Sequence, residues 1–278
     1  MSTNPPKSDG DTDAQHAIDN HRAYVGNERD YDFLGASQFR LLCALGLREN
    51  HRLLDLGCGS LRAGRLFIAY LRPGHYYGIE PNPWLIDSAI EEEVSSGLVE
   101  LKQPTFAHNS DFAVDGFGVE FDFILAQSIF SHTEIDLTRT ALSNFRKSLK
   151  PGGRCLMTFA VGNATFPGTD WVYPKTVSYP RALIRQLASE CDLDVVELDW
   201  FHPRQRWFLM VAKGDRLPTA TELDMLSGVV LYDRKLSVSA SAMGRRARSI
   251  SLYYKYSILP RLRRVQGWLR GRKHRGHV

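Results

Sequence analysis

The stretch LLDLGCGSLRAGRL, residues 53–66, decides the fold of this 278-residue chain. An apolar run ends in an acid, Asp55, and two glycines, Gly57 and Gly59, precede a segment of helical character. A strand, a glycine turn and a helix form the first unit of an open α/β sheet, and ligands bind at the edge where such a turn lies. The stretch therefore predicts an α/β domain with a ligand at this turn.

The residues around the two glycines separate two classes of nucleotide. The dinucleotide fingerprint has a third glycine three residues after the second, where the helix packs closely on the strand. Arg62 occupies that position here. A strand-end acid beside a glycine turn also suits an ammonium group better than a pyrophosphate. These residues favour S-adenosylmethionine over NAD.

Composition bounds the class of protein. With 43% hydrophobic and 11% aromatic residues, the chain has enough apolar material for a core. Its four cysteines show neither C-x-x-C pairing nor zinc-finger spacing, which predicts reduced thiols, a cytoplasmic protein and no metal site. No stretch reaches the roughly 18 apolar residues of a membrane span, and the polar N-terminus predicts neither a signal peptide nor an anchor. Roughly the first twenty residues are expected to be disordered.

Apolar runs alternate with amphipathic segments along the chain, as in a parallel sheet covered by helices. The last two strands differ, because only five residues, FHPRQ, join them, and a helical crossover needs more. They are expected to form an antiparallel hairpin. The expected strands are 52–56, 76–80, 99–102, 121–127, 154–161, 194–200 and 206–213; the expected helices are 31–47, 60–71, 83–97, one that ends at 149–153, and 178–193.

Glu80 ends the second expected strand, 25 residues after Asp55. An α/β nucleotide-binding domain has its ribose-binding acid at that place, and a carboxylate accepts two hydroxyl hydrogens at once. The alternative is an ordinary solvated acid at a strand end. The preceding DLGCG turn favours the ribose role.

Four segments, LLDLGCG, YYGIEPN, FDFILAQSIFSH and LKPGGRCLMTF, resemble in order and spacing the successive motifs of class I S-adenosylmethionine-dependent methyltransferases. The resemblance covers roughly residues 36–214. It implies a Rossmann-like, seven-stranded, mostly parallel sheet with an antiparallel C-terminal hairpin. It also implies cofactor contacts for Asp55, Gly57 and Gly59 at the methionine end, Glu80 at the ribose, and Gln127 and Ser128 after the fourth strand.

Two further cofactor contacts are expected. The family often has an acid after the third strand near the adenine amino group, and HNSDF offers Asp111 to accept a hydrogen bond and Phe112 to pack on the ring. Arg62 is a candidate clamp for the cofactor's carboxylate, because a guanidinium binds carboxylates bidentately. The alternative for Arg62 is a surface helix arginine.

Catalytic candidates follow the fourth and fifth strands. His132 is the candidate general base, since its pKa lies near neutrality, and the alternative is a structural helix cap. Asp170 is a second possible base in the aromatic-rich stretch PGTDWVYPKTVSY, where Trp171 and Tyr173 stack on an acceptor or pack the loop. His202, in the hairpin turn, is expected to face solvent.

The C-terminal part is strongly basic. Residues 245–278 contain eleven Lys or Arg, and no acid follows Asp233. Arginines mixed with aromatic and aliphatic residues favour an anionic membrane surface over nucleic acid, and a merely solvated tail is the third alternative. Thr219 and Glu222 form a capping-box pattern that predicts a helix at 219–236. The expected division is a flexible segment 1–30, a methyltransferase domain 31–214 and a helical, basic extension 215–278.

These observations predict a methyltransferase without a metal that moves a methyl group from S-adenosylmethionine to a hydroxyl of a small-molecule, glycan or lipid-linked acceptor. AQSI stands where N-methyltransferases of amides and DNA have Asn-Pro-Pro-Tyr, which argues against those acceptors. An RNA methyltransferase that uses the basic tail and a non-catalytic cofactor-binding scaffold are the alternatives.

Overall fold

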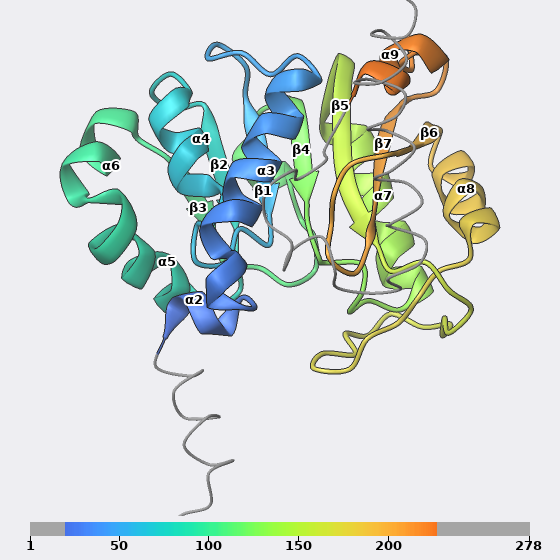
Figure 1. The fold of residues 1–278 in the computed structure, drawn as a ribbon, viewed down its shortest axis with the longest axis horizontal. Helices are drawn as coiled ribbons and strands as arrows, with labels where there is room; N and C mark the ends of the chain where they lie inside the picture. The colour runs from blue at the N-terminus through green and yellow to red at the C-terminus, as the bar shows by residue number, and fades with distance from the viewer. Residues whose placement is uncertain (1–19, 227–278) are drawn as a thin grey trace, which may run out of the picture. The chain divides into compact units, whose positions relative to one another are not determined.

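The computed structural model describes residues 20–226, which form a seven-stranded sheet with the order β3-β2-β1-β4-β5-β7-β6 (Figure 1). Neighbouring strands among β1 to β5 are parallel, and β7 is antiparallel to both β5 and β6. The expected sheet with its antiparallel C-terminal hairpin is confirmed. The strands are β1 Leu53–Leu56, β2 Tyr76–Ile79, β3 Thr105–Ala107, β4 Phe121–Ala126, β5 Leu149–Phe159, β6 Leu193–Leu198 and β7 Arg206–Ala212.

Helices cover both faces of the sheet. Side chains that alternate along β1 enter two different apolar clusters, Leu53 one and Leu54 the other. Residues of α3 and α4 join the cluster of Leu53, and residues of α7 and α8 join that of Leu54. The helices are α2 His21–Tyr24, α3 Tyr31–Ala44, α4 Gly64–Tyr70, α5 Pro83–Ala89, α6 Ser96–Lys102, α7 Ile135–Ser148, α8 Arg181–Glu190 and α9 Ala220–Met225.

The expected strand at 99–102 is wrong, because this segment belongs to α6. The side chain of Ser95 accepts a hydrogen bond from Leu98 N at 3.4 Å and caps the helix. Leu98 and Val99 pack on the apolar cluster of α3 and α4, and Lys102 Nζ donates to Leu71 O at 2.7 Å. Tertiary packing overrides the local strand preference here. The third strand is β3, and the expected helix 83–97 is α5 followed by a π-helical turn, η2 (Ile90–Val94).

The carboxyl ends of β1, β2 and β4 meet at one edge of the sheet. Since β1 lies between β2 and β4, the chain order reverses there, and a crevice opens at this switch point in α/β sheets. Helix α2 and the loop from 160 to 180 lie at the same edge, the lower one in Figure 1. We call this edge the carboxyl edge.

Helix α9 has the expected capping box between Thr219 and Glu222. The helix expected at 219–236 is shorter than predicted, because α9 ends at Met225 and Leu226 is its extended C-cap. Residues 227–278, which include the basic segment 245–278, and residues 1–19 lie outside the described residues.

Candidate active site

The glycine turn after β1 has a backbone that only glycine adopts easily. Gly57 has φ +66° and Gly59 has φ +54°, both in the left-handed region. A Cβ at Gly57 would lie 2.1 Å from Ile129 Cδ1, and one at Gly59 would lie 2.9 Å from Val25 Cγ1. The turn therefore packs closely against side chains from the β4–α7 connection and from the residue after α2.

Glu80 is fixed directly beside this turn. Its carboxylate is 7% exposed, and Oε2 accepts a hydrogen bond from Gly59 N at 3.2 Å. Oε1 accepts from Asn82 N at 3.0 Å and from Asn82 Nδ2 at 2.9 Å. An ionised carboxylate has about four acceptor positions, so Oε2 keeps capacity for a further donor such as a ribose hydroxyl.

Asp55 lies buried behind the turn. Its Oδ2 accepts a hydrogen bond from the Tyr76 hydroxyl at 2.9 Å. Burial raises the pKa of Asp55 to about 6, against the lowering effects of Tyr76 and Arg62. This carboxyl therefore changes charge close to neutral pH.

Arg62 is not a surface helix arginine. It precedes α4, and its Nη1 donates to Val25 O at 3.2 Å while its Nη2 donates to Gln127 Oε1. Its Nε is buried and has no hydrogen-bond partner in the described part of the chain, and burial lowers the pKa of the guanidinium. Within residues 20–226, no carboxylate lies within ion-pair distance of Arg62.

Gln127 and Ser128 follow β4, where the resemblance has them. Besides Arg62, the Gln127 oxygen accepts from Gln38 Nε2 at 3.3 Å. Ser128 has φ +65°, and its backbone N–H donates to Thr158 Oγ1 at 2.7 Å. These bonds fix the chain direction at the end of β4.

His202 is half-buried and its ring is directed at the end of β4, so the expectation that it faces solvent is wrong. The turn between β6 and β7 carries the ring to the end of β4, where Nε2 is 2.7 Å from Gln127 Nε2 and 3.5 Å from Ser128 Oγ. Burial, followed by the cations Arg62 and Arg204, lowers the pKa of His202 to about 3. The sequence hides this contact, because it joins residues 75 positions apart.

The segment after β3 is held by aromatic packing. Phe112 is buried, with its ring centroid 5.2 Å from that of Trp171, and the Trp171 indole donates to Ser110 O at 2.9 Å. Trp171 thus packs the 160–180 loop onto this segment. Asp111 is exposed, and its Oδ1 accepts from Ala113 N at 3.1 Å. The nearby Asn109 Oδ1 is buried and has no hydrogen-bond partner among residues 20–226, which makes it a further acceptor for an amino group.

His132 and Asp170 lie on two segments that pair with each other. Thr133 and Trp171 form a β-bridge between them, and Glu134 N donates to Asp170 O at 3.0 Å. His132 Nδ1 is 2.8 Å from Lys175 O, so this nitrogen carries the proton and Nε2 keeps a lone pair. Asp170 is exposed. The geometry gives His132 the free acceptor nitrogen that a general base needs.

Helix α2, which the sequence did not mark as part of the site, closes the carboxyl edge. Val25 packs on the glycine turn, and Tyr24 contacts Trp84 with ring centroids 5.3 Å apart. Burial and the nearby Tyr173 and Glu80 raise the pKa of the Tyr24 phenol. Helix α2 has only four residues, which is too few for a sequence pattern that would predict this role.

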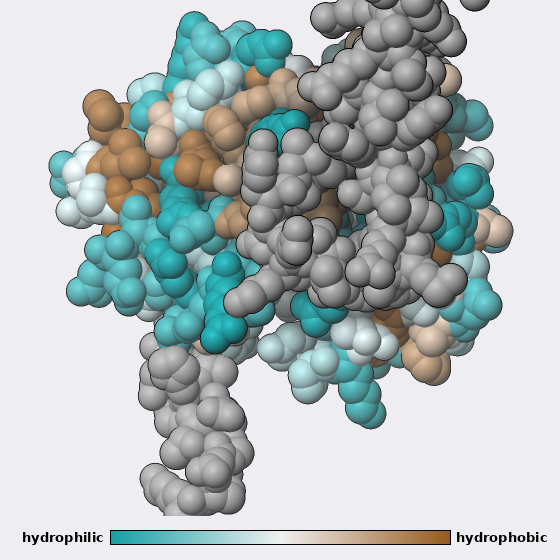
Figure 2. Space-filling model, viewed as in Figure 1, coloured by the Kyte–Doolittle hydropathy of each residue, from teal (hydrophilic) through white to brown (hydrophobic). Residues whose placement is uncertain are grey.

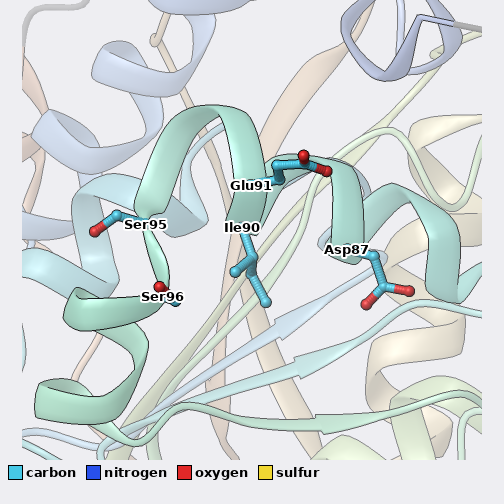
Figure 3. Close-up of a pocket in the computed structure, with 5 residues that line it drawn as sticks. All are labelled: Asp87, Ile90, Glu91, Ser95 and Ser96. Carbon is cyan, nitrogen blue, oxygen red and sulfur yellow. The ribbon is translucent and has the colours of Figure 1, made fainter.

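Two surface features lie apart from the site. A hollow of about 420 Å³ is formed by Asp87, Ile90, Glu91, Ser95 and Ser96 of the α5–η2–α6 segment (Figure 3). Hydrophobic residues reach the surface on the side of α6 (Figure 2), where Leu101 is 65% exposed. None of the expected site residues lines this hollow.

Three findings bear on the class of protein. In residues 20–226, no helix is long and apolar enough to cross a membrane. The same residues hold no group of three or more side chains suited to a metal ion. All four cysteines are free thiols.

Known proteins match this fold. A family profile described as a methyltransferase domain matches residues 54–155. Magnesium protoporphyrin IX methyltransferase from Synechocystis, with bound S-adenosylhomocysteine, is similar with a TM-score of 0.53 and 17% identity, over 73% of this chain and 97% of that one. An S-adenosylmethionine-dependent methyltransferase from Clostridium acetobutylicum has a TM-score of 0.52 and 14% identity, over 74% and 99%. The CcbJ methyltransferase from Streptomyces caelestis has 0.52 and 15%, over 68% and 92%.

Proposed function

We propose that this chain is a class I S-adenosylmethionine-dependent methyltransferase that methylates a hydroxyl of a small-molecule, glycan or lipid-linked acceptor, as the matching methyltransferase profile and the similar fold suggest. The observation that carries the proposal is His132, which lies at the carboxyl edge beside the 160–180 loop and whose Nδ1 bonds Lys175 O, leaving Nε2 without a proton. When bound, the cofactor supplies an electrophilic methyl group on a sulfonium. The residues of this chain then hold the two reactants in line and exclude water.

Support for cofactor binding comes from the glycine turn and Glu80. A carboxylate fixed by Gly59 N and Asn82 has one oxygen with spare acceptor capacity, which suits the ribose hydroxyls. Asp55 offers negative charge near the cofactor's ammonium group. Gln127 and Ser128 remain the proposed contacts beside the methionyl part, and Asp111 and Phe112 those near the adenine.

Arg62 fits the carboxylate of the cofactor. Its partners in the described chain are neutral oxygens, and its buried Nε has none. A buried guanidinium without a carboxylate is costly, and an incoming carboxylate relieves that cost. Arg62 is therefore the proposed clamp for the amino-acid end.

His132 is the proposed general base. Its Nδ1–H donates to Lys175 O, which fixes the ring and directs Nε2 away from that bond. Nε2 takes the proton of the acceptor hydroxyl as the oxygen attacks the methyl carbon. Tyr173, whose ring centroid is 5.2 Å from that of His132, and the exposed Asp170 are proposed acceptor contacts.

The test is transfer of a labelled methyl group from S-adenosylmethionine to a panel of hydroxyl-bearing phenols, sugars and prenyl-linked glycans, with amine-bearing analogues and RNA as competitors. The proposal expects a hydroxyl acceptor to be labelled and its amine analogue not to be. Labelling of RNA or of amines alone would contradict it, and cofactor binding without any transfer would favour a scaffold.

We also propose that residues 245–278 bind an anionic membrane surface, which would bring the enzyme to a lipid-linked acceptor. The support is the sequence alone: eleven cations interleaved with aromatic and aliphatic side chains. Sedimentation of the full chain with phosphatidylglycerol vesicles, phosphatidylcholine vesicles and single-stranded RNA tests it. Binding to the first only is expected, and binding to RNA only would contradict it.

A further inference from the structure

The histidine of the β6–β7 turn has a fixed tautomer. His202 Nδ1 accepts hydrogen bonds from the backbone N–H groups of Arg204 at 3.2 Å and Gln205 at 2.9 Å. A nitrogen that accepts has no proton, so the neutral ring carries its proton on Nε2. His202 is therefore a hydrogen-bond donor toward the end of β4.

Too many donors meet at this point. The Gln127 amide faces the Arg62 guanidinium, the Gln38 amide nitrogen and His202 Nε2–H, yet an amide has a single acceptor atom. When the Gln127 oxygen faces Arg62, the Gln127 N–H groups face the N–H of His202, and two donors meet. If the amide were flipped, its N–H groups would face the N–H groups of Arg62 instead. Within the described chain, the next acceptor for His202 Nε2–H is Ser128 Oγ at 3.5 Å.

Two further observations indicate a missing acceptor. Arg62 Nε is buried without a partner, so the surplus of donors includes a charged group. No carboxylate in residues 20–226 lies within ion-pair distance of Arg62. A carboxylate accepts up to about four hydrogen bonds and donates none, which matches what this cluster lacks.

We propose that His202, together with Arg62 and Gln127, binds the carboxylate of the cofactor's amino-acid part, with His202 as a neutral Nε2–H donor. The inference rests on the proposed function and adds to the cofactor site a side chain from the β6–β7 turn, at the far end of the sheet. The cofactor is the source because Arg62 also bonds Val25, which packs on the glycine turn at Gly59. Val25 thus contacts both the Arg62 cluster and the glycine turn, so the two lie next to each other.

The test compares two ligands that differ only at the amino-acid end. S-adenosylhomocysteine has the carboxylate, whereas 5′-methylthioadenosine retains the adenosine and sulfur without it. Calorimetric affinities are measured for the full-length wild type, His202→Ala and His202→Gln. His75→Ala is the matched control, since His75 lies before β2 and its Nδ1 contacts His51 O at 3.3 Å.

The expected result is a loss of about tenfold in affinity for S-adenosylhomocysteine in His202→Ala, with methylthioadenosine affinity unchanged. His202→Gln, which keeps an N–H donor, should recover part of the loss. An equal loss of affinity for both ligands would mean that His202 only packs against its neighbours. An unchanged affinity for S-adenosylhomocysteine would exclude the contact. Either result overturns the inference. Wild type that binds neither ligand would instead overturn the proposed function itself.

A nitrogen-detected NMR measurement on the wild type avoids any folding defect of the variants. The His202 Nε2–H resonance should shift with S-adenosylhomocysteine and stay unchanged with methylthioadenosine. A ring protonated on Nδ1, or a resonance that responds equally to both ligands, would contradict the proposal.

Discussion

Individual titrating residues of the site act on stability in opposite directions. The pKa of His202 is lowered to about 3, because burial and the neighbouring Arg62 and Arg204 disfavour the imidazolium. In the unfolded chain the histidine has an ordinary pKa near 6.5. Its contribution to stability is therefore present above about pH 6.5 and is lost as the pH falls toward 3.

We predict that His202→Gln flattens the acid side of the stability curve. Between pH 6 and 4 the wild type should lose up to about 1.4 kcal/mol per pH unit through this residue, and the variant should not. Urea denaturation at a series of pH values measures the difference. Parallel curves for the two proteins would mean that His202 is protonated in the folded state.

Asp55 has the opposite sign. Its pKa is raised to about 6 in the fold, so its protonated form is the stable one, and stability is lost as the pH rises through 6. At pH 8, Asp55→Asn should raise the free energy of unfolding by about 2–3 kcal/mol, since the amide carries no charge and still accepts from Tyr76. A variant less stable than wild type at pH 8 would contradict this account.

For single residues, the sequence predicted where a polar side chain lies in the fold better than it predicted the hydrogen-bond partners of that side chain. Glu80 and the two glycines were predicted from their place after strands, and in the structure Gly59 N donates to Glu80 Oε2 at 3.2 Å. The sequence did not predict the positions of His202 and Asn109 beside the proposed site, because these positions depend on how loops fold back. Arg62 was singled out from the sequence, but its burial and its bond to Gln127 could not be predicted.

Helix α2 is held to the domain partly by an ion pair. Arg22 on α2 and Arg65 on α4 both bind Glu93 of η2, whose side chain is 5% exposed; the Arg65 Nη1 contact is 2.6 Å. This ion-paired cluster holds α2 against the glycine turn. A buried carboxylate that bridges two arginines is strongly coupled to the position of both.

We predict that Glu93→Gln releases α2 selectively. Amides of residues 20–30 should exchange with solvent at least about tenfold faster, and affinity for S-adenosylhomocysteine should fall, while β4 and β5 remain protected. Glu91→Gln, on the surface hollow of the same turn, is the control and should change neither. Uniformly faster exchange across the sheet would show that Glu93 stabilises the whole domain instead.

Among the elements, the sequence pattern predicted the strands whose two faces are buried in the sheet. Runs such as FDFILA became strands because both of their faces meet apolar clusters, and the five-residue turn forced the antiparallel hairpin. The predicted strand at 99–102 was wrong for the opposite reason. The conformation of a short, half-exposed segment is set by what it packs against, and Leu98 and Val99 reach the apolar cluster of α3 and α4 as part of a helix. Four-residue α2 is too short for any periodicity.

Residues 20–226 form a methyltransferase-like fold, and the proposed ligand-binding edge gathers residues from β1, β2, β4, the β6–β7 turn and α2. A ligand that contacts all of them stabilises the folded state by mass action. We predict that S-adenosylhomocysteine at 100 times its dissociation constant adds about 2.7 kcal/mol, which raises Tm by about 5 °C or more. No shift at saturation would mean that the ligand binds the unfolded chain equally well or not at all.

The most direct test of the central claim is calorimetric titration of the full-length protein with S-adenosylhomocysteine and with NAD, repeated on Glu80→Gln. We expect micromolar binding of S-adenosylhomocysteine, no binding of NAD, and a loss of about tenfold or more in the variant, because an amide accepts fewer ribose hydrogen bonds than a carboxylate. Glu91→Gln should bind as wild type does. Binding of NAD, or binding of S-adenosylhomocysteine that is indifferent to Glu80→Gln, would contradict the account.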